Sequence, residues 1–395
     1  MASARNSMEI LEGDSQEQQD VEEGRQIPIA NIYHLLCYAW GFFELDVEVQ
    51  VEADNHSGYT ELLTKVLTAG CVHLIKQGLH RDYQARTEPM RAVRGKLELA
   101  PSLATGRLEQ GIAVCTHDEF TADIPANQIL KSVLMRMARS RGMDAILASA
   151  ARNAALRMTG VSAIELHLRM LGRVRIHRNN RFYGFLLSIC QLVMEAVSVK
   201  ESQDALVETE QRFYGVIEKR LPALFEAFSR KFYQKHVAGA GGWTHAGRRN
   251  LNWQWEALTL GSEVFLPKME TDITLEHPDR KIIMDTKFYN SGGISREKFH
   301  STNMYQLNSY VTQCAMDARA RIARGDEPRH PHDIDAEGML LYATVGDQDF
   351  HHKYSMPPHR MAVATVNLAR DWQTVEARLL EVIEIRSNEG TGKKA

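Results

Sequence analysis

The segment between Lys268 and Phe288 constrains the fold of this chain more than any other. Two strand-like stretches, Lys268–Leu275 and Lys281–Phe288, are separated by the turn-forming residues HPDR, which predicts an antiparallel hairpin. The uninterrupted apolar run Ile282–Met284 is typical of a central strand that is covered on both faces. Because helical patterns flank these strands in the sequence, we expect an α/β sandwich in this half of the chain.

Two charged residues follow this apolar run. Alternate residues of a strand share a face, so Asp285 and Lys287 point the same way, and Asp272 on the partner strand can reach the same point. Burying charge is costly, so these residues are expected to serve a purpose. Neighbouring carboxylates repel each other unless a cation lies between them, and Mg²⁺ prefers such oxygen ligands. The three residues therefore predict a metal-assisted phosphodiesterase site, in which Lys287 orients or deprotonates the attacking water.

The rest of the chain alternates between helical and strand-like patterns. Apolar residues recur at helical spacing in the segments Ile29–Glu44, Tyr59–Gln77, Asn127–Arg141, Phe185–Val197, Leu221–His236 and Asn303–Met316. Short stretches bounded by turn residues predict strands at Arg81–Met90, Gly95–Ala100, Ile112–Phe120, Gly338–Val345 and Ala362–Leu368. The first three of these strands predict a small sheet or barrel in the first half of the chain.

Changes in composition predict the domain boundaries. Residues 1–26 are rich in Gln, Glu and Asp and predict a disordered tail, as does the segment 387–395 at the other end. The basic stretch Gly172–Arg181 lacks periodicity and is the candidate boundary between a first domain, 27–172, and a second domain, 173–386.

Composition excludes several classes of protein. No window approaches about 18 apolar residues and the N-terminus has no apolar core, so neither a membrane span nor a signal peptide is expected. The five cysteines are scattered, which argues against a zinc knuckle or a disulfide framework and favours the cytoplasm. No G-x-x-x-x-G-K-[ST] occurs, so the chain is not expected to hydrolyse nucleotide. The pairs His330/His332 and His351/His352 are expected in surface loops.

Ordered segments along almost the whole chain carry a family resemblance. The D…D-x-K hairpin resembles the PD-(D/E)-x-K nuclease superfamily. A narrower resemblance rests on the segments IPIANIYHLLCYAWG, GLHRDY, VRGKLEL, LPKMETDITL, IIMDTKFY, EKFHSTNMYQLNSY, GMLLYA and VNLARDW. With these segments, the chain resembles the McrC family, the nuclease subunits of McrBC modified-cytosine restriction systems, between Ile27 and about Ile385.

The resemblance implies roles for individual residues. It makes Asp272 and Asp285 ligands of Mg²⁺ and Lys287 the catalytic lysine. Glu226 in LFEAF matches a glutamate on the helix before the hairpin, which is a further metal ligand in some superfamily members. Gln306 in MYQLNSY matches a glutamine that supports the metal centre or the DNA backbone. Thr271 stands where the superfamily most often has proline, a departure that removes backbone rigidity and no ligand.

The resemblance also implies an architecture and partners. It predicts an α/β (α+β overall) protein: an N-terminal helical-plus-β-barrel-like domain that binds a partner, followed by a PD-(D/E)-x-K restriction-endonuclease-like α/β/α domain. The expected partners are double-stranded DNA with modified cytosine, a GTP-hydrolysing McrB-like AAA+ ring that the chain stimulates, and a second copy of the nuclease domain.

Two other functions remain open at this point. One is a stand-alone nuclease of the same fold, used in DNA repair or recombination. The other is a catalytically silent DNA-binding scaffold, against which the complete Asp272–Asp285–Lys287 set argues.

Overall fold

A computed structural model divides the chain into two compact units. It describes residues 27–40, 58–104, 106, 108–177, 180–197, 206–254, 258–259, 262–289, 299–346 and 349–384. One unit spans Glu44–Glu218, and the other combines Met1–Phe43 with Lys219–Ala395. We refer to them as the middle unit and the C-terminal unit. The two predicted tails lie outside the described residues.

Four helices form the body of the middle unit. Its helices are α3 (Tyr59–Gln77), α4 (Leu99–Ala104), α5 (Pro125–Met137), α6 (Ala145–Arg157) and α7 (Arg181–Val197), with 3-10 segments at Leu108–Gln110 and Leu168–Arg173. Helices α3, α5, α6 and α7 pack together through the apolar stripes that the sequence predicts. Gly70 permits the close approach of α3 and α7, because a Cβ there would lie 2.4 Å from the side chain of Leu186.

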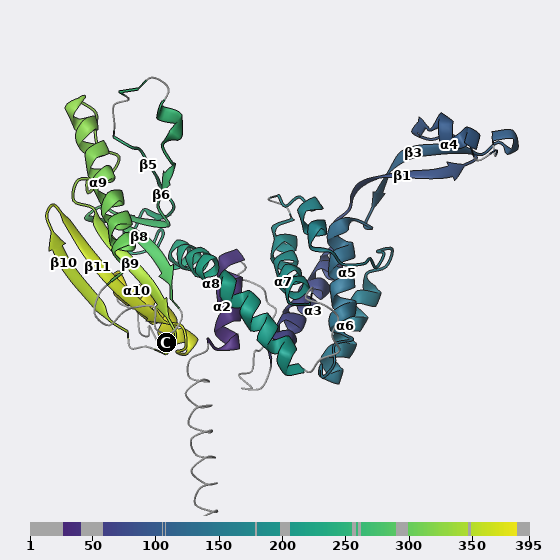
Figure 1. The fold of residues 1–395 in the computed structure, drawn as a ribbon, viewed down its shortest axis with the longest axis horizontal. Helices are drawn as coiled ribbons and strands as arrows, with labels where there is room; N and C mark the ends of the chain where they lie inside the picture. Colours follow the sequence, from purple (N-terminus) through teal and green to yellow (C-terminus); the bar gives the residue numbers. More distant parts are fainter. Residues whose placement is uncertain are drawn as a thin grey trace, which may run out of the picture. The chain divides into compact units, whose positions relative to one another are not determined.

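The three predicted strands of the middle unit form an open sheet. Strands β1 (Asp82–Met90), β2 (Lys96–Leu97) and β3 (Ala113–Thr121) are antiparallel in the order β1-β3-β2, and β1 is exposed along most of its length. Figure 1 shows this sheet, with α4 beside it, extending beyond helices α3, α5, α6 and α7. The predicted barrel is not found among the described strands, because three strands of which one has two residues do not close on themselves.

The C-terminal unit is built on a six-stranded sheet with the order β10-β11-β9-β8-β7-β4. Its strands are β4 (His245–Gly247), β7 (Ile273–His277), β8 (Arg280–Phe288), β9 (Glu337–Thr344), β10 (His351–Met356) and β11 (His359–Asn367). Strand β9 runs parallel to both β8 and β11, and the other neighbours are antiparallel. A two-stranded ribbon, β5 (Asn250–Leu251) with β6 (Met269–Glu270), precedes β7 and carries a 3-10 segment at Ser262–Phe265.

Helix α9 (Ser301–Ala323) covers the face of the sheet that carries Ile283 (Figure 1). Leu307 and Val311 of this helix join Ile283, Leu340 and other fully buried side chains in one core. Helices α2 (Ile29–Trp40), α8 (Leu206–His236) and α10 (Trp372–Val382) complete the unit. The mixed α/β architecture and the predicted hairpin are thus confirmed.

The division into units differs from the predicted boundary at Gly172–Arg181 in two ways. Helix α2, expected in the first domain, packs in the C-terminal unit, where Asn31 Nδ2 donates to the carbonyls of Leu368 and Arg370 at 2.8 and 2.7 Å. Helix α7, expected in the second domain, packs on α3 and α5 in the middle unit. The change from one unit to the other falls between Glu218 and Lys219, inside helix α8 and not in a loop.

No helix within the described part of the chain is long and apolar enough to span a membrane.

Candidate active site

The register of the β7–β8 hairpin brings the two predicted aspartates together. It pairs Ile273 with Met284 and His277 with Arg280. Continued by one residue, the same register sets Asp272 opposite Asp285. Residues directly opposite in an antiparallel pair lie on one face, and Lys287 shares that face because it is two residues further along β8. All three residues therefore meet at the open end of the hairpin, as predicted.

Asp272 lies where one ladder of hydrogen bonds gives way to another. The β4–β7 ladder ends at the pair Gly247–Thr274, and the β5–β6 ladder begins at the pair Asn250–Glu270. Between the two ladders, the two residues 248–249 face the three residues 271–273, which is the residue count of a β-bulge. Bulges redirect side chains, and Asp272 is one of the residues of this one.

Hydrogen bonds of Thr271 hold this junction. Its amide donates to the carbonyl of Arg249 at 2.9 Å, and its hydroxyl accepts from the amide of Arg249 at 3.0 Å. The hydroxyl also shares a hydrogen bond of 2.8 Å with that of Thr274. Proline has no N–H to donate, so the threonine fixes the backbone here by bonds that the more common residue could not make.

Asp285 is a buried carboxylate that has one ion pair and lacks well-formed hydrogen bonds from the described residues. Its side chain is 0% exposed, and its Oδ2 lies 2.7 Å from Lys287 Nζ as an ion pair. Neither oxygen accepts a well-formed hydrogen bond from any described residue. Burial, together with the charge of Asp272, raises the pKa of Asp285 to about 6, against the lowering effect of Lys287. Such a group is expected either to hold a proton or to hold a cation.

Asp272 is oriented by β8. Its Oδ2 accepts from the amide and the hydroxyl of Thr286, at 2.9 and 3.0 Å. Burial raises the pKa of Asp272, the hydrogen bonds from Thr286 lower it, and the charge of Glu226 raises it again; the net change is upward. Asp272 and Asp285 thus have the electrostatics of two carboxylates that share a site.

Lys287 is held from helix α9. Its Nζ donates to Gln306 Oε1 at 3.4 Å, and Gln306 Nε2 donates to the hydroxyl of Tyr310 at 2.8 Å. Burial alone would lower the pKa of Lys287, but the bond to Asp285 raises it, so the lysine carries its charge at neutral pH. The family resemblance placed Gln306 here, and the structure adds Tyr310, which the sequence analysis did not single out. The one-turn spacing of these two residues on α9 was the available signal.

Glu226 has different partners from the two aspartates. Its Oε1 accepts from Arg230 Nη1 at 2.8 Å and from Arg248 Nη2. Among the described residues, no group of three His, Cys, Asp or Glu side chains is arranged to hold a metal ion, and the metal-ligand role expected for Glu226 stays a prediction. Asp272 and Asp285 remain as the pair that fits a cation. Two carboxylates suffice for Mg²⁺, which keeps several waters and binds substrate phosphate.

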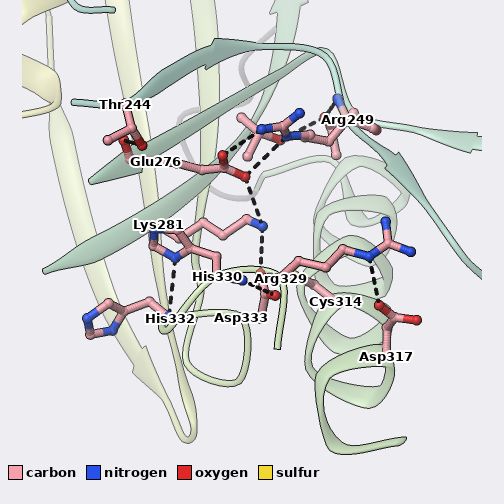
Figure 2. Close-up of polar contacts among 12 residues, drawn as sticks. Thr244, Arg249, Glu276, Lys281, Cys314, Asp317, Arg329, His330, His332 and Asp333 are labelled. Atoms are coloured by element: carbon pink, nitrogen blue, oxygen red, sulfur yellow. Dashed lines mark hydrogen bonds and ion pairs between the residues drawn. The ribbon is translucent and has the colours of Figure 1, made fainter. Parts of the chain in front are cut away.

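A second group of charged side chains lies on the same face at the other end of the hairpin (Figure 2). We call Arg249, Glu276, Lys281 and Asp333 the paired cluster. Lys281 Nζ lies 2.6 Å from Asp333 Oδ1 and 3.3 Å from Glu276 Oε1, and Arg249 Nη2 lies 2.7 Å from Glu276 Oε2. Burial would raise the pKa of Glu276, but these cations lower it to about 2. Every charge in this cluster has a partner of opposite sign.

Two of the histidine predictions are corrected here. His330 is buried beside the paired cluster, and its amide donates to Asp333 Oδ2 at 2.9 Å. His351 and His352 lie on strand β10 and not in a loop. The sequence did not reveal that the loop 324–336 turns inward to supply Asp333 as the partner of Lys281.

Comparisons with known proteins cover most of the chain. The family model described as "McrBC 5-methylcytosine restriction system component" matches residues 13–321, a range that includes every candidate site residue. A curated relative from Escherichia coli (strain K12), "Type IV methyl-directed restriction enzyme EcoKMcrBC", is 28% identical over 363 residues, which are 91% of this chain and 97% of the relative.

Two solved structures are also similar to the chain. One is a half-complex of Thermococcus gammatolerans McrB AAA+ hexamers with bound McrC: 13% identity, a TM-score of 0.49, and coverage of 91% of this chain and 78% of the other. The second is the Thermococcus gammatolerans McrBC complex, with 17% identity, a TM-score of 0.34, and coverage of 49% and 58%. TM-scores this low support no conclusion about fold or function. The extent of the family match, however, confirms the resemblance found in the sequence, and the chain belongs to the family of McrBC 5-methylcytosine restriction system components.

Proposed function

We propose that this chain is the Mg²⁺-dependent DNA endonuclease subunit of a methylation-dependent restriction system. One observation carries the proposal: Asp285 is fully buried, has two oxygens without hydrogen bonds from the described residues, and lies beside Asp272 and Lys287. A cation between the two aspartates would satisfy these oxygens. Membership of a family of restriction-system components makes a DNA phosphodiester the fitting substrate.

The residues of the site have different proposed roles. Asp272 and Asp285 would hold the metal ion, which supplies an activated water and neutralises charge on the phosphate when bound. Thr286 fixes Asp272 through two hydrogen bonds, so this carboxylate needs little reorganisation. Lys287, charged and held by Gln306, orients the attacking water and stabilises negative charge that develops on the phosphate.

The proposal includes a partner and a modified substrate. The chain has no lysine-bearing phosphate loop, so a separate GTP-hydrolysing AAA+ ring is proposed to activate it and to be stimulated by it. The middle unit offers a docking surface on its small sheet, where Tyr83 and Phe120 are 67% and 55% exposed although both are large apolar residues. The name of the Escherichia coli relative describes a methyl-directed enzyme, which favours DNA with modified cytosine as the substrate.

Plasmid cleavage tests the proposal. Methylated and unmethylated plasmid would be incubated with the chain, with and without a ring encoded beside it and GTP. We expect cutting of methylated plasmid with Mg²⁺, the ring and GTP together, and none with Ca²⁺ or EDTA. Cutting without ring or GTP would favour the stand-alone nuclease. Cutting that resists EDTA would contradict the metal site, and no cutting under any condition would favour the scaffold.

GTP turnover by the ring tests the partner separately. The chain should accelerate turnover, and the Asp285→Asn variant should do so equally, because the nuclease site takes no part in it. The double variant Tyr83→Ala/Phe120→Ala should lose the acceleration, since it removes the exposed apolar surface of the small sheet. Loss of stimulation in folded Asp285→Asn protein would contradict this separation of roles.

A further inference from the structure

Glu226 is bound by two guanidinium groups in a way that ill suits a metal ligand. Both Arg230 Nη1 and Arg248 Nη2 contact the same oxygen, Oε1. Arg230 lies one turn further along α8, so it fixes the glutamate from its own helix. Burial would raise the pKa of Glu226, but the two arginines lower it below its usual value. A metal ion at this carboxylate would have to displace or oppose two fixed cations.

Arg248 lies at the junction that also contains Asp272. It follows β4 directly, and the next residue, Arg249, is bonded to Thr271 and to Glu276. The backbone at Arg248 is therefore fixed on both sides. The charge of Asp272 acts on the guanidinium, and Nη1 lies 3.8 Å from Glu270 Oε1.

The guanidinium of Arg248 remains accessible. Its side chain is 45% exposed, compared with 27% for Glu226 and 18% for Arg230. Nη2 thus contacts Glu226 closely and Nη1 has only the longer contact with Glu270, while the side chain stays half-exposed and feels the charge of Asp272. A guanidinium held in one orientation is the preferred group for binding a phosphate through two parallel hydrogen bonds.

The charges of the site also favour a cation that can bind the phosphate. Asp272, Asp285, Glu226 and Glu270 are four acidic groups that would repel the DNA backbone. Lys287, held by Asp285 and Gln306, is proposed to act on the attacking water and on the charge that develops during the reaction. Arg248 is the half-exposed cation next to the site that can approach the phosphate from the side of the β5–β6 ribbon.

From this geometry we infer that Glu226 is a positioning residue, which holds Arg248 so that its guanidinium binds the DNA phosphate at the cut site. The inference rests on the proposed nuclease function and replaces the metal-ligand role implied for Glu226 by the resemblance. It commits Arg248 to the DNA backbone and therefore to no particular base.

Three variants of the full chain in its assembled complex test the inference: Glu226→Gln, Arg248→Gln and the double variant. Each single change should lower kcat/KM for methylated plasmid by about 10- to 100-fold, the range of a charge-assisted hydrogen bond. The double variant should fall within about twofold of the singles, because both changes remove one interaction. Arg248→Lys should recover part of the loss, since it keeps the positive charge but not the planar group that forms two parallel hydrogen bonds.

Two further readouts separate positioning from folding or metal binding. Calorimetric titration of the DNA-free chain with Mg²⁺ should give affinities within about twofold of wild type for all these variants. The logarithmic dependence of DNA affinity on salt, measured in Ca²⁺, should become shallower by about one unit in Arg248→Gln. Arg329→Gln is the matched control, because Arg329 is also half-exposed and paired with an acid, Asp317, in the same unit, and it should match wild type throughout (Figure 2).

Several results would overturn the inference. If Glu226→Gln weakens Mg²⁺ binding tenfold or more while Arg248→Gln does not, Glu226 is a metal ligand. If Arg248→Gln tightens Mg²⁺ binding and leaves the salt dependence unchanged, the arginine only neutralises the acidic site. If the two losses in kcat/KM multiply in the double variant, this result would also contradict the inference. Wild-type protein that never cuts DNA would refute the proposed function itself, whereas cutting that depends on Asp285 but not on these two residues would refute only the inference.

Discussion

The two ends of the β7–β8 hairpin present buried charges in opposite states. At the turn end, Lys281 and Asp333 are only 6% and 5% exposed, and each has partners: Lys281 contacts two carboxylates, and both oxygens of Asp333 accept hydrogen bonds. At the open end, Asp285 is 0% exposed, has one ion pair with Lys287, and accepts no well-formed hydrogen bond from the described residues. Both ends lie on the same face beneath α9.

This difference indicates which end is structural and which is functional. Removing a charge from water costs several kcal/mol, and close partners of opposite sign offset that cost. The paired cluster has these partners within the chain, so it holds the hairpin, the loop 324–336 and the β4–β5 junction together. At the open end, Asp285 has one close cation, Lys287, and the repelling charge of Asp272 nearby, so a ligand from outside can supply further positive charge there.

The largest expected effect separates the two ends by activity. Asp285→Asn should reduce cleavage of methylated plasmid below detection, because it removes a metal ligand while changing little volume. Asp333→Asn should leave cleavage within about tenfold of wild type at a temperature where it stays folded, since the hydrogen bonds of Asp333 are with Lys281, His330 and Cys314, away from the open end. Equal losses of cleavage in both variants, measured on the same plasmid, would contradict the distinction between a functional and a structural end.

The next effect separates the ends by stability. Asp333→Ala should lower the free energy of unfolding by about 3 kcal/mol, because it leaves Lys281 buried with only Glu276 at 3.3 Å. Urea denaturation followed by circular dichroism measures this change. Asp326→Ala is the control, since Asp326 belongs to an exposed pair with Arg324 and its loss should cost below about 1 kcal/mol. If the paired cluster is unnecessary for stability, the urea midpoints of Asp333→Ala and Asp326→Ala will be similar.

At the open end, we expect a substitution to raise the free energy of unfolding, and we expect this gain to depend on pH. The pKa of Asp285 is raised from 3.8 to about 6, so the folded state binds this proton more tightly than the unfolded state does. The corresponding stability is present below pH 3.8 and is lost as the pH rises through about 6. Without metal, Asp285→Asn should therefore be more stable than wild type by about 1–3 kcal/mol at pH 8 and lose most of this advantage at pH 4. Urea denaturation in EDTA at both pH values checks this, and a destabilised variant at pH 8 would contradict it.

The smallest effect is expected at Thr271, at the junction of the β4–β7 and β5–β6 ladders. Thr271→Val removes the hydroxyl bonds to Arg249 and Thr274 and should cost about 1–2 kcal/mol, whereas Thr271→Ser keeps them and should cost less. If the junction sets the direction of Asp272, the valine variant should also lower kcat more than the serine variant does. Equal kcat values in the two variants, measured on the same plasmid, would restrict Thr271 to a structural role.

The sequence predicted the hairpin and its central residues because both depend on local order. The turn residues 277–280 set the register, and the register alone brings Asp272 opposite Asp285. The apolar run before Asp285 correctly indicated a buried strand. Gln306 and Lys287 could be joined because the family resemblance related the helix after the hairpin to the strand end.

What the sequence could not provide depends on contacts between distant residues. Asn31 bonds with a carbonyl 337 residues away, so no local pattern assigns α2 to the C-terminal unit. Asp333 partners a lysine 52 residues before it, and its loop reads as polar and solvated. Arg248 was visible as a charge, but its pairing with Glu226 depends on how α8 lies against the end of β4.

Metal binding by the full-length protein tests the central claim most directly. Calorimetric titration with Mg²⁺ at pH 7.5, about 1.5 units above the raised pKa of Asp285, would compare wild type, Asp285→Asn and Asp333→Asn. We expect binding by wild type and by Asp333→Asn with the same affinity, and no binding by Asp285→Asn, because the buried oxygens of Asp285 accept no well-formed hydrogen bond from the described residues, whereas both oxygens of Asp333 do. An unchanged isotherm for Asp285→Asn, or loss of binding in folded Asp333→Asn, would contradict the account.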